Sequence, residues 1–498
     1  MVIPVYLNET AKAATREVAH LHLAVFGMQP EFLDVYSEYA YCIDVEMDGL
    51  LYVGDFRYLP ENYCRRLTIS QDRCTMKQFV AHLFVSSIEQ LRDVELPWGI
   101  LTGIRPQKLY RKLHEAHSQA KTRQIANTLY LIKENKIRLL EQVYDIQRPV
   151  LSQYADRSSI SLYIGIPYCP SKCSYCTFGG HICSGEAEQS AYFSALLDEL
   201  RSVLSWIRRY QLRIASVYVG GGTPSTLTVG QIEQLFAEFE QYALAIGELM
   251  PLACGEISFE AGRADAISRE QLLTLKRMGV ERISINPQTF RDHTLRALNR
   301  RHTTDDVLGA YETARQIGFS HINMDIILGL PGETVDDVAF TLAQLEHLRP
   351  EAITMHALAL KTKSTLQRQW ELEQFKHGTN IDDMLSIAQP WAKANGYLPY
   401  YLYRQKNIAG NMENVGYALP GKHSLYNIFS MEESMPIIGI GCGAVSKMID
   451  ADSGKLERLA NPVNPNFYIR SIAEVIEKKQ KQLPQILTNE RRNMYDSD

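Results

Sequence analysis

The sequence predicts an α/β protein built on an incomplete six-stranded (β/α)6 barrel, with an N-terminal α+β accessory domain and a C-terminal mixed domain. Two observations support this prediction. Between residues 159 and 361, short apolar runs alternate with helical patterns, which is typical of parallel strands joined by crossover helices. Residue types that often carry chemistry follow these runs, and in barrels of this kind the chemistry gathers at the carboxyl ends of the strands.

The barrel prediction rests on six apolar runs, each separated from the next by a helical pattern such as 188–208 or 229–246. Such a connection between parallel strands is expected to be right-handed. We assign residues 156–362 to the barrel. After about residue 361 the alternation is lost, so residues 363–498 are predicted to form the C-terminal mixed domain. The six predicted strands lie at 161–166, 216–219, 256–259, 282–285, 322–328 and 352–356.

Residues 1–155 are predicted to form the accessory domain. The runs 41–47 and 50–56 flank Asp48-Gly49, and an Asp-Gly pair between two alternating runs indicates a β-hairpin. A helix is expected over 75–94, and further helices between 107 and 150. This region contains no constellation of residues that suggests catalysis.

The overall composition restricts the class of protein. A chain of 498 residues is too long for one hydrophobic core and should form two or three domains. Its net charge of −5 does not suggest a nucleic-acid partner. The first residues do not resemble a signal peptide, and no run is long and apolar enough to span a membrane. We therefore expect a cytoplasmic protein with neither a nucleic-acid nor a membrane partner.

Three cysteines are the most informative feature of the chain. Cys169, Cys173 and Cys176 form a C-x3-C-x2-C pattern. Three thiolates at this spacing can hold three irons of a cubane cluster and leave the fourth iron open. Structural zinc, the alternative, takes four ligands and commonly uses C-x2-C pairs, and no second pair follows here. Cys183 lies close by, but we expect it to be a free loop thiol because the pattern is complete without it.

Further residues at the predicted strand ends indicate a small ligand. The glycines at 220–222 follow the second strand and allow backbone groups to approach a ligand closely. Glu260 follows the third strand and can accept hydrogen bonds from a ribose or an ammonium group, while Arg300 can pair with a carboxylate. Taken singly, the glycines are also compatible with a simple tight turn, and the charged residues with surface salt bridges. Their common position at strand ends favours a ligand site.

Together these residues resemble the radical S-adenosylmethionine superfamily. The cysteine pattern is similar to its cluster motif, and Gly221-Gly-Thr-Pro224 is similar to the loop that contacts the methionine amino group. The segments 163–169, 284–288, 298–300 and 323–332 resemble the anaerobic coproporphyrinogen oxidase group within it. Segments 98–106 and 400–417 are typical of one branch of that group, the coproporphyrinogen dehydrogenase-like proteins.

The resemblance implies a [4Fe-4S] cluster held by Cys169, Cys173 and Cys176, together with one or two molecules of S-adenosyl-L-methionine. It assigns no catalytic side chain. Two departures from the family's oxidases leave the reaction and a second cofactor molecule open. Gly165 stands where those oxidases have histidine, and Phe178 where they have a further cysteine. The residues implied to contact S-adenosylmethionine are Tyr163, Tyr175, Gly221, Gly222, Thr223, Glu260, Gln288, Arg300 and Asp325.

The implied activity is the oxygen-independent oxidative decarboxylation of coproporphyrinogen III to protoporphyrinogen IX in haem biosynthesis, through 5′-deoxyadenosyl radical chemistry. The implied partners are the tetrapyrrole substrate and an electron donor such as flavodoxin or ferredoxin. Two alternatives remain. Haem chaperones of the superfamily share Phe178 and carry a C-terminal His-Asn motif, where this chain has His423 and Asn427. Radical methyl transfer to a tetrapyrrole is the other.

The propionates of such a substrate need polar partners outside the barrel. We expect them from segments 404–407 and 439–443, the first through Arg404 and the second through backbone groups beside glycines. The alternative for Arg404 is an ion pair at a domain interface.

Overall fold

The computed structural model describes residues 2–8, 29–34, 36–37, 40–101, 103, 105–155, 158–176, 180–250, 252–359, 381–405, 412–450, 453 and 455–487. These residues form two sheets with helices packed against them. Within these ranges, no helix combines the length and the hydrophobicity that a membrane crossing requires.

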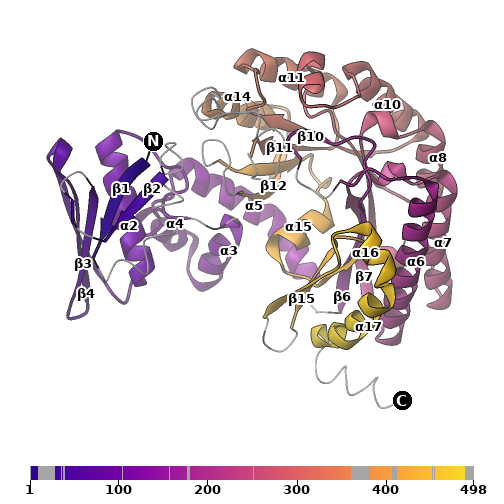
Figure 1. Ribbon diagram of the computed structural model, residues 1–498, viewed down its shortest axis with the longest axis horizontal. Helices are drawn as coiled ribbons and strands as arrows, with labels where there is room; N and C mark the ends of the chain where they lie inside the picture. Colours follow the sequence, from indigo (N-terminus) through magenta and orange to yellow (C-terminus); the bar gives the residue numbers. More distant parts are fainter. Residues whose placement is uncertain are drawn as a thin grey trace.

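The N-terminal sheet has the strand order β2-β1-β3-β4-β5 (Figure 1). The predicted hairpin is confirmed as β3 and β4, and its register pairs Asp48 with Leu51, so the two-residue loop is Gly49-Leu50. Gly49 has a φ of 59°, a left-handed conformation that favours glycine. The strands are β1 (Val2–Leu7), β2 (Gln29–Leu33), β3 (Tyr41–Asp48), β4 (Leu51–Tyr58) and β5 (Tyr63–Ser70).

Four helices follow this sheet. The predicted helix over 75–94 is confirmed as α2 (Met76–Arg92), which begins at Thr75 in a capping box with Gln78. The face of α2 that carries Phe79, Leu83 and Phe84 packs into the core of the N-terminal sheet. The next three helices contribute to the core of the larger sheet instead. They are α3 (Pro106–Ala116), α4 (Gln119–Thr128) and α5 (Glu134–Gln153).

The larger sheet contains all six predicted strands. They pair in chain order, β6 to β11, and every pair among them is parallel. The predicted α/β architecture, with a large parallel sheet and flanking helices, is therefore confirmed. The strands are β6 (Ser159–Ile166), β7 (Arg213–Gly221), β8 (Glu256–Gly262), β9 (Arg282–Ile285), β10 (His321–Leu328) and β11 (Ala352–Ala357).

The connecting helices cover one face of this sheet (Figure 1). Several begin at a threonine or serine that caps the first turn, as Thr228, Ser268 and Thr303 do. Their apolar sides bury residues such as Leu235 and Phe236 in the main core. These helices are α6 (Glu186–Arg209), α7 (Val229–Ala245), α8 (Arg269–Arg277), α9 (Asp292–Ala297), α10 (Thr304–Ile317) and α11 (Val335–Leu348).

The C-terminal part of the chain extends the larger sheet at both edges. β12 (Leu398–Tyr403) and β13 (Asn414–Ala418) add beside β11, with β13 antiparallel to it. At the other edge β14 (Ile437–Ile440) pairs parallel with β6, and it is followed by β15 (Val445–Ile449) and β16 (Leu456–Ala460). The helices of this part are α14 (Ile381–Ala394), α15 (Leu425–Glu432), α16 (Pro465–Arg470) and α17 (Ile472–Gln482).

Candidate functional site

One cavity of about 360 Å³ lies at the carboxyl ends of the parallel strands. The three cysteines of the motif line it, and so do all the predicted cofactor-binding residues except Tyr163. Another part of its wall comes from β11, β12, β13 and α15. The predicted residues at the cavity are Cys169, Cys173, Cys176, Tyr175, Gly221, Gly222, Thr223, Glu260, Gln288, Arg300 and Asp325.

The cysteine loop is fixed at both ends by backbone hydrogen bonds. At its start, the Cys169 N–H donates to the His181 carbonyl at 2.9 Å, and the His181 N–H donates to the Pro167 carbonyl at 2.8 Å. Further along, the Ser174 N–H donates to the Leu298 carbonyl at 3.1 Å. The loop is therefore anchored on the segments that flank it and on Leu298, which is distant from it in sequence.

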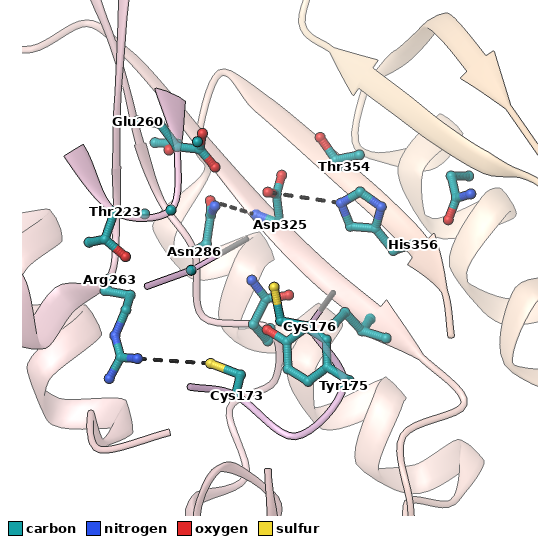
Figure 2. Close-up of a pocket in the computed structure, with 18 of the residues that line it drawn as sticks. Cys173, Tyr175, Cys176, Thr223, Glu260, Arg263, Asn286, Asp325, Thr354 and His356 are labelled. Atoms are coloured by element: carbon teal, nitrogen blue, oxygen red, sulfur yellow. Dashed lines mark hydrogen bonds and ion pairs between the residues drawn. The ribbon is translucent and has the colours of Figure 1, made fainter. Parts of the chain in front are cut away.

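Donor groups surround the cysteine sulfurs. The hydroxyl of Thr223 lies 3.3 Å from the Sγ of Cys169. A guanidinium nitrogen of Arg263 lies 3.8 Å from the Sγ of Cys173, and one of Arg300 lies 4.0 Å from the same atom. Figure 2 shows Arg263 directed at Cys173. Donors and cations at these positions stabilise the negative charge of a thiolate ligand.

The donor set fits a cluster better than a single metal ion. Among the described residues, no three His, Cys, Asp or Glu side chains gather as ligands of one ion. A cubane makes a different demand, because each of its cysteines binds a separate iron. Cys169, Cys173 and Cys176 line one cavity and would hold the [4Fe-4S] cluster there. Cys183 does not line the cavity, and its thiol donates to the Gly185 carbonyl instead.

The glycine loop packs directly under the cysteine loop. The Gly222 N–H donates to the Ile166 carbonyl at 2.7 Å, and the Thr223 N–H donates to the Tyr168 carbonyl at 2.8 Å. A Cβ atom on Gly222 would lie 2.7 Å from the Tyr168 carbonyl and 3.0 Å from the Sγ of Cys169. Gly221 has a φ of 120°, which disfavours any other residue. The glycines therefore allow a close approach between two backbone segments as well as an approach to a ligand.

Two carboxylates in the cavity have opposite pKa shifts. Burial and the charge of Asp325 raise the pKa of Glu260 to about 8, although the Gly221 N–H donates to this carboxylate. Burial also opposes ionisation of Asp325, but His356 and Asn323 outweigh it and hold the pKa of Asp325 below its usual value. The Asn323 amide donates to Asp325 at 2.9 Å, and the Nε2 of His356 lies 3.9 Å from it. The site therefore combines one readily ionised and one weakly acidic carboxyl group.

Backbone strain marks the position of Gln288. Its φ of 66° lies in the left-handed region, which is uncommon for residues other than glycine. The Gln288 N–H donates to the Asp325 carbonyl at 2.9 Å, and its own carbonyl accepts from the Ile327 N–H at 2.9 Å. These two bonds hold Gln288 against β10 and direct the chain into the cavity.

Arg300 joins the cysteine loop to the end of β9. One guanidinium nitrogen donates to the Tyr175 hydroxyl at 2.8 Å, and another donates to the Asn286 carbonyl at 3.2 Å. Burial raises the pKa of Tyr175 to about 12. Only 7% of Arg300 is exposed, and its Nε has no hydrogen-bond partner within the described residues. A ligand carboxylate would supply such a partner.

Two residues that the sequence analysis assigns to ligands do not line the cavity. Tyr163 does not line the cavity, because it stacks behind it with Tyr218 and Tyr426 at centroid distances of 6.3 and 6.1 Å. Arg404 is also absent from the lining. It is buried against the Trp98 ring and donates to the Leu101 carbonyl at 2.6 Å, so its contact with a substrate stays a prediction that these contacts do not support.

The second predicted substrate segment, 439–443, does not line the cavity either. Gly439 belongs to β14, and its N–H donates to the Ser446 hydroxyl. Gly441 packs against the Gly165 carbonyl, where a Cβ atom would lie 2.4 Å from the oxygen. Both glycines serve sheet packing. Residues 406 and 407, like Phe178, lie outside the described residues.

Several polar residues at the cavity were not predicted. His356 lies near the carboxyl end of β11, between Asp325 and Tyr403, whose hydroxyl is 3.3 Å from Nδ1 of the imidazole (Figure 2 shows the Asp325 side). Arg263 follows β8 directly. Both obey the rule that placed Glu260 and Gln288, since they stand at the carboxyl ends of parallel strands. That rule could have identified them.

Comparison with known proteins agrees with this geometry. Residues 163–345 match the family model described as the radical SAM superfamily. The chain is 39% identical over 414 residues to the oxygen-independent coproporphyrinogen-III oxidase-like protein HemZ of Bacillus subtilis (strain 168), with 82% of each chain covered. It is 27% identical to the heme chaperone HemW of Escherichia coli (strain K12), over 62% of this chain and 76% of that one.

A solved structure supports the fold. The radical SAM enzyme coproporphyrinogen III oxidase (HemN) of Escherichia coli matches with a TM-score of 0.51 at 22% identity, over 70% of this chain and 81% of that one. The superfamily implies a [4Fe-4S] cluster and S-adenosylmethionine, and the cysteine-lined cavity has the residues to hold them. The chain therefore belongs to the radical SAM superfamily and, within it, to the family of the coproporphyrinogen-III oxidase-like protein HemZ.

Proposed function

We propose that this protein oxidatively decarboxylates the propionate side chains of coproporphyrinogen III to vinyl groups and so forms protoporphyrinogen IX. The observation that carries the proposal is the composition of the cavity. The cluster cysteines and the predicted cofactor residues form one wall, and α15 and the residues around β12 and β13 form another. A substrate held against the second wall would face the cofactors.

The second wall suits a ring system with acidic side chains. It contains the aromatic Tyr401 and Tyr403, the apolar Met431, and the amides of Asn414 and Asn427. Aromatic and apolar surface can pack against pyrrole rings, and amide N–H groups can donate to carboxylates. The similarity to HemZ, a coproporphyrinogen-III oxidase-like protein, supports a substrate of this class.

The cofactors and the chain have separate tasks in the proposed reaction. When bound, the cluster and S-adenosylmethionine supply one-electron radical chemistry at a carbon–hydrogen bond. The chain positions the reacting groups and excludes water. Arg300 and Glu260 would orient the cofactor, and Asn414 and Asn427 the substrate. After hydrogen abstraction, each propionate loses CO₂ and passes one electron to an acceptor, while the first electron comes from a donor such as flavodoxin or ferredoxin.

An anaerobic assay of the reconstituted protein tests the proposal. It contains coproporphyrinogen III, S-adenosylmethionine, a reductant and an electron acceptor, and the products are identified by mass spectrometry. We expect a tetrapyrrole that has lost two carboxyl groups as CO₂, together with 5′-deoxyadenosine. A substrate that stays unchanged while 5′-deoxyadenosine accumulates would contradict the proposal.

A haem chaperone is the second candidate, because the HemW chaperones are also similar to this chain. His423, the histidine of the compared motif, does not line the cavity, whereas Asn427 does. Haem titration followed by absorbance would support this alternative if haem bound stoichiometrically and no product formed. A methylated tetrapyrrole would instead indicate methyl transfer.

A further inference from the structure

Arg263 is buried beside the cysteine loop. The proposed reaction gives this residue no role. It follows β8 directly after Gly262, whose φ of 51° turns the chain at the end of the strand. Only 5% of Arg263 is exposed, and its side chain lines the cavity. A charged group buried this deeply needs partners for its N–H groups.

Asp265 determines the direction of the guanidinium. Its two carboxylate oxygens accept from the Nε and from one terminal nitrogen of Arg263, at 3.0 and 2.7 Å. The imidazole Nδ1 of His302 lies 3.8 Å from the same carboxylate. This two-point contact occupies one edge of the guanidinium and leaves the other terminal nitrogen for the cysteine loop.

That remaining nitrogen contacts the loop at three atoms. It donates to the Ser171 hydroxyl at 2.8 Å and to the Ser171 carbonyl at 3.2 Å, and it lies 3.8 Å from the Sγ of Cys173. Arg300 also approaches Cys173, but the nitrogen that does so donates to the Tyr175 hydroxyl at 2.8 Å, and the other terminal nitrogen donates to the Asn286 carbonyl. Within the described residues, the hydrogen bonds of the Arg263 side chain therefore go to Asp265 and to the loop that holds the cluster.

We propose that Arg263 is a positioning residue of the iron–sulfur cluster, which directs an N–H group at the Cys173 sulfur and thereby raises the reduction potential of the cluster. Reduction adds one negative charge to the cluster and its thiolates. A hydrogen-bond donor at a ligand sulfur stabilises the reduced form more than the oxidised form. The proposal requires the cluster but not the tetrapyrrole. Its test therefore does not depend on whether the proposed function is correct.

The ion pair with Asp265 makes the proposal more specific. Because Asp265 compensates most of the positive charge, the directed N–H group and not the net charge should carry the effect. A lysine at this position can keep the ion pair. It cannot hold both oxygens of Asp265 and also direct an N–H group at Cys173, because its ammonium group lacks the planar fork of the guanidinium.

The test measures the midpoint potential of the cluster by redox titration followed by electron paramagnetic resonance, without S-adenosylmethionine or tetrapyrrole. The variants are Arg263→Gln and Arg263→Lys, each reconstituted anaerobically to about four irons per chain. Arg315→Gln is the matched control, because Arg315 also pairs with a carboxylate, Glu351 at 3.0 Å, but does not line the cavity.

We expect both Arg263 variants to have a more negative midpoint potential than the native protein, and Arg315→Gln to have the native value. If Arg263→Gln does not retain four irons, the midpoint potential of Arg263→Lys is compared with that of the native protein instead. A native potential in Arg263→Gln at full iron content would overturn the proposal. A native potential in Arg263→Lys would overturn it as well, because charge alone would then suffice.

Discussion

Gly222 shows how tightly the glycine loop and the cysteine loop pack at the scale of single residues. From sequence alone, a substitution here is expected to weaken S-adenosylmethionine binding and to leave the iron in place. The structure changes that expectation. A Cβ atom would meet the Tyr168 and Pro167 carbonyls at 2.7 and 2.9 Å and the Sγ of Cys169 at 3.0 Å. Two of these neighbours are backbone atoms, which cannot move without displacing a cluster ligand.

We therefore predict that Gly222→Ala lowers the iron content after anaerobic reconstitution to well below the native value. Iron and sulfide analysis, with the absorbance of the cluster, measures the effect. Gly230→Ala in α7 is the control, because a Cβ atom there has no neighbour within 4 Å. Native iron content in Gly222→Ala would show that the loop can adjust to the added atom.

Glu260 is expected to affect stability as a function of pH. Burial and the neighbouring Asp325 raise its pKa to about 8, from about 4.3 in an unfolded chain. The folded state therefore binds a proton more tightly than the unfolded state does. The resulting stability is fully present below the unfolded pKa and is lost as the pH rises through about 8.

For the protein without S-adenosylmethionine, we predict that Glu260→Gln removes this loss of folding stability at high pH. The melting temperature of the native protein, relative to that of Glu260→Gln, should fall between pH 6 and pH 9. Thermal unfolding followed by circular dichroism measures it across that range. A constant difference between the two proteins would mean that Glu260 does not titrate there.

Single residues also show what sequence reasoning can and cannot place. Glu260 and Gln288 were found because each follows a recognisable strand. Arg263 obeys the same rule, yet an arginine within a polar turn resembles many surface arginines. Tyr163 and Arg404 lie outside the cavity lining for another reason. The direction of each side chain depends on partners that are distant in sequence, namely Tyr426 for the first and Trp98 for the second.

At the scale of elements, the segment after α9 supports the cysteine loop. Leu298, Asn299 and Arg300 each contact it, through a carbonyl that accepts from Ser174, an amide that donates to Lys172, and a guanidinium that donates to the Tyr175 hydroxyl. Asn299 has a φ of 58°, a conformation that asparagine tolerates better than most residues. The sequence run Leu-Asn-Arg thus has three separate physical roles.

We predict that Asn299→Asp weakens retention of the cluster. Aspartate tolerates the same backbone conformation but cannot donate to the Lys172 carbonyl, which costs about 1 kcal/mol of loop stability. Iron release to a chelator under anaerobic conditions should be several-fold faster than in the native protein. Asn395→Asp is the control, because its amide also donates to a carbonyl, that of Trp391, in α14. Equal release rates in the two variants would contradict the prediction.

The positions of the strands in the sequence were easier to predict than their pairing within the sheet. The six parallel strands could be located because each is an apolar run bounded by helical patterns, and local sequence determines such runs. The pairing of β14 with β6 joins segments of the chain more than 270 residues apart in sequence. No local pattern encodes a pairing of that range. For this reason the C-terminal strands were expected only as a mixed domain, and their addition to both sheet edges was not foreseen.

At the scale of the whole molecule, buried ion pairs join distant parts of the chain. Glu199 of α6 and Lys479 of α17 form one pair, which Tyr468 and Asn461 complete. It holds α17 against α6, one of the helices that cover the larger sheet. Burial lowers the pKa of Lys479, although the charge of Glu199 opposes this shift. The assignment of residues 1–155, 156–362 and 363–498 to three domains stays a prediction.

A second buried pair connects the N-terminal helices to the cavity wall. The Nζ of Lys136, in α5, lies 2.6 Å from Glu413, which also accepts from Trp98 at 2.9 Å and from Gln389 at 3.1 Å. The neighbouring Asn414 lines the cavity and accepts from the Ala357 N–H at 3.0 Å. The N-terminal helices thus support the strand that completes the proposed substrate wall.

The last prediction concerns this connection. Lys136→Met removes one partner of a fully buried pair and leaves the Glu413 carboxylate without its cation. Such a loss typically costs about 3–5 kcal/mol, because the remaining charge stays buried. We expect a large decrease in the denaturation midpoint in urea. Turnover should fall with it, because Asn414 loses its support.

Lys455→Met is the matched control, since Lys455 pairs with Glu457 at the surface, with 72% of its side chain exposed. An exposed pair contributes at most about 1 kcal/mol. If the two variants unfold at the same urea concentration, Glu413 does not depend on Lys136, and the N-terminal helices do not support the cavity through this pair.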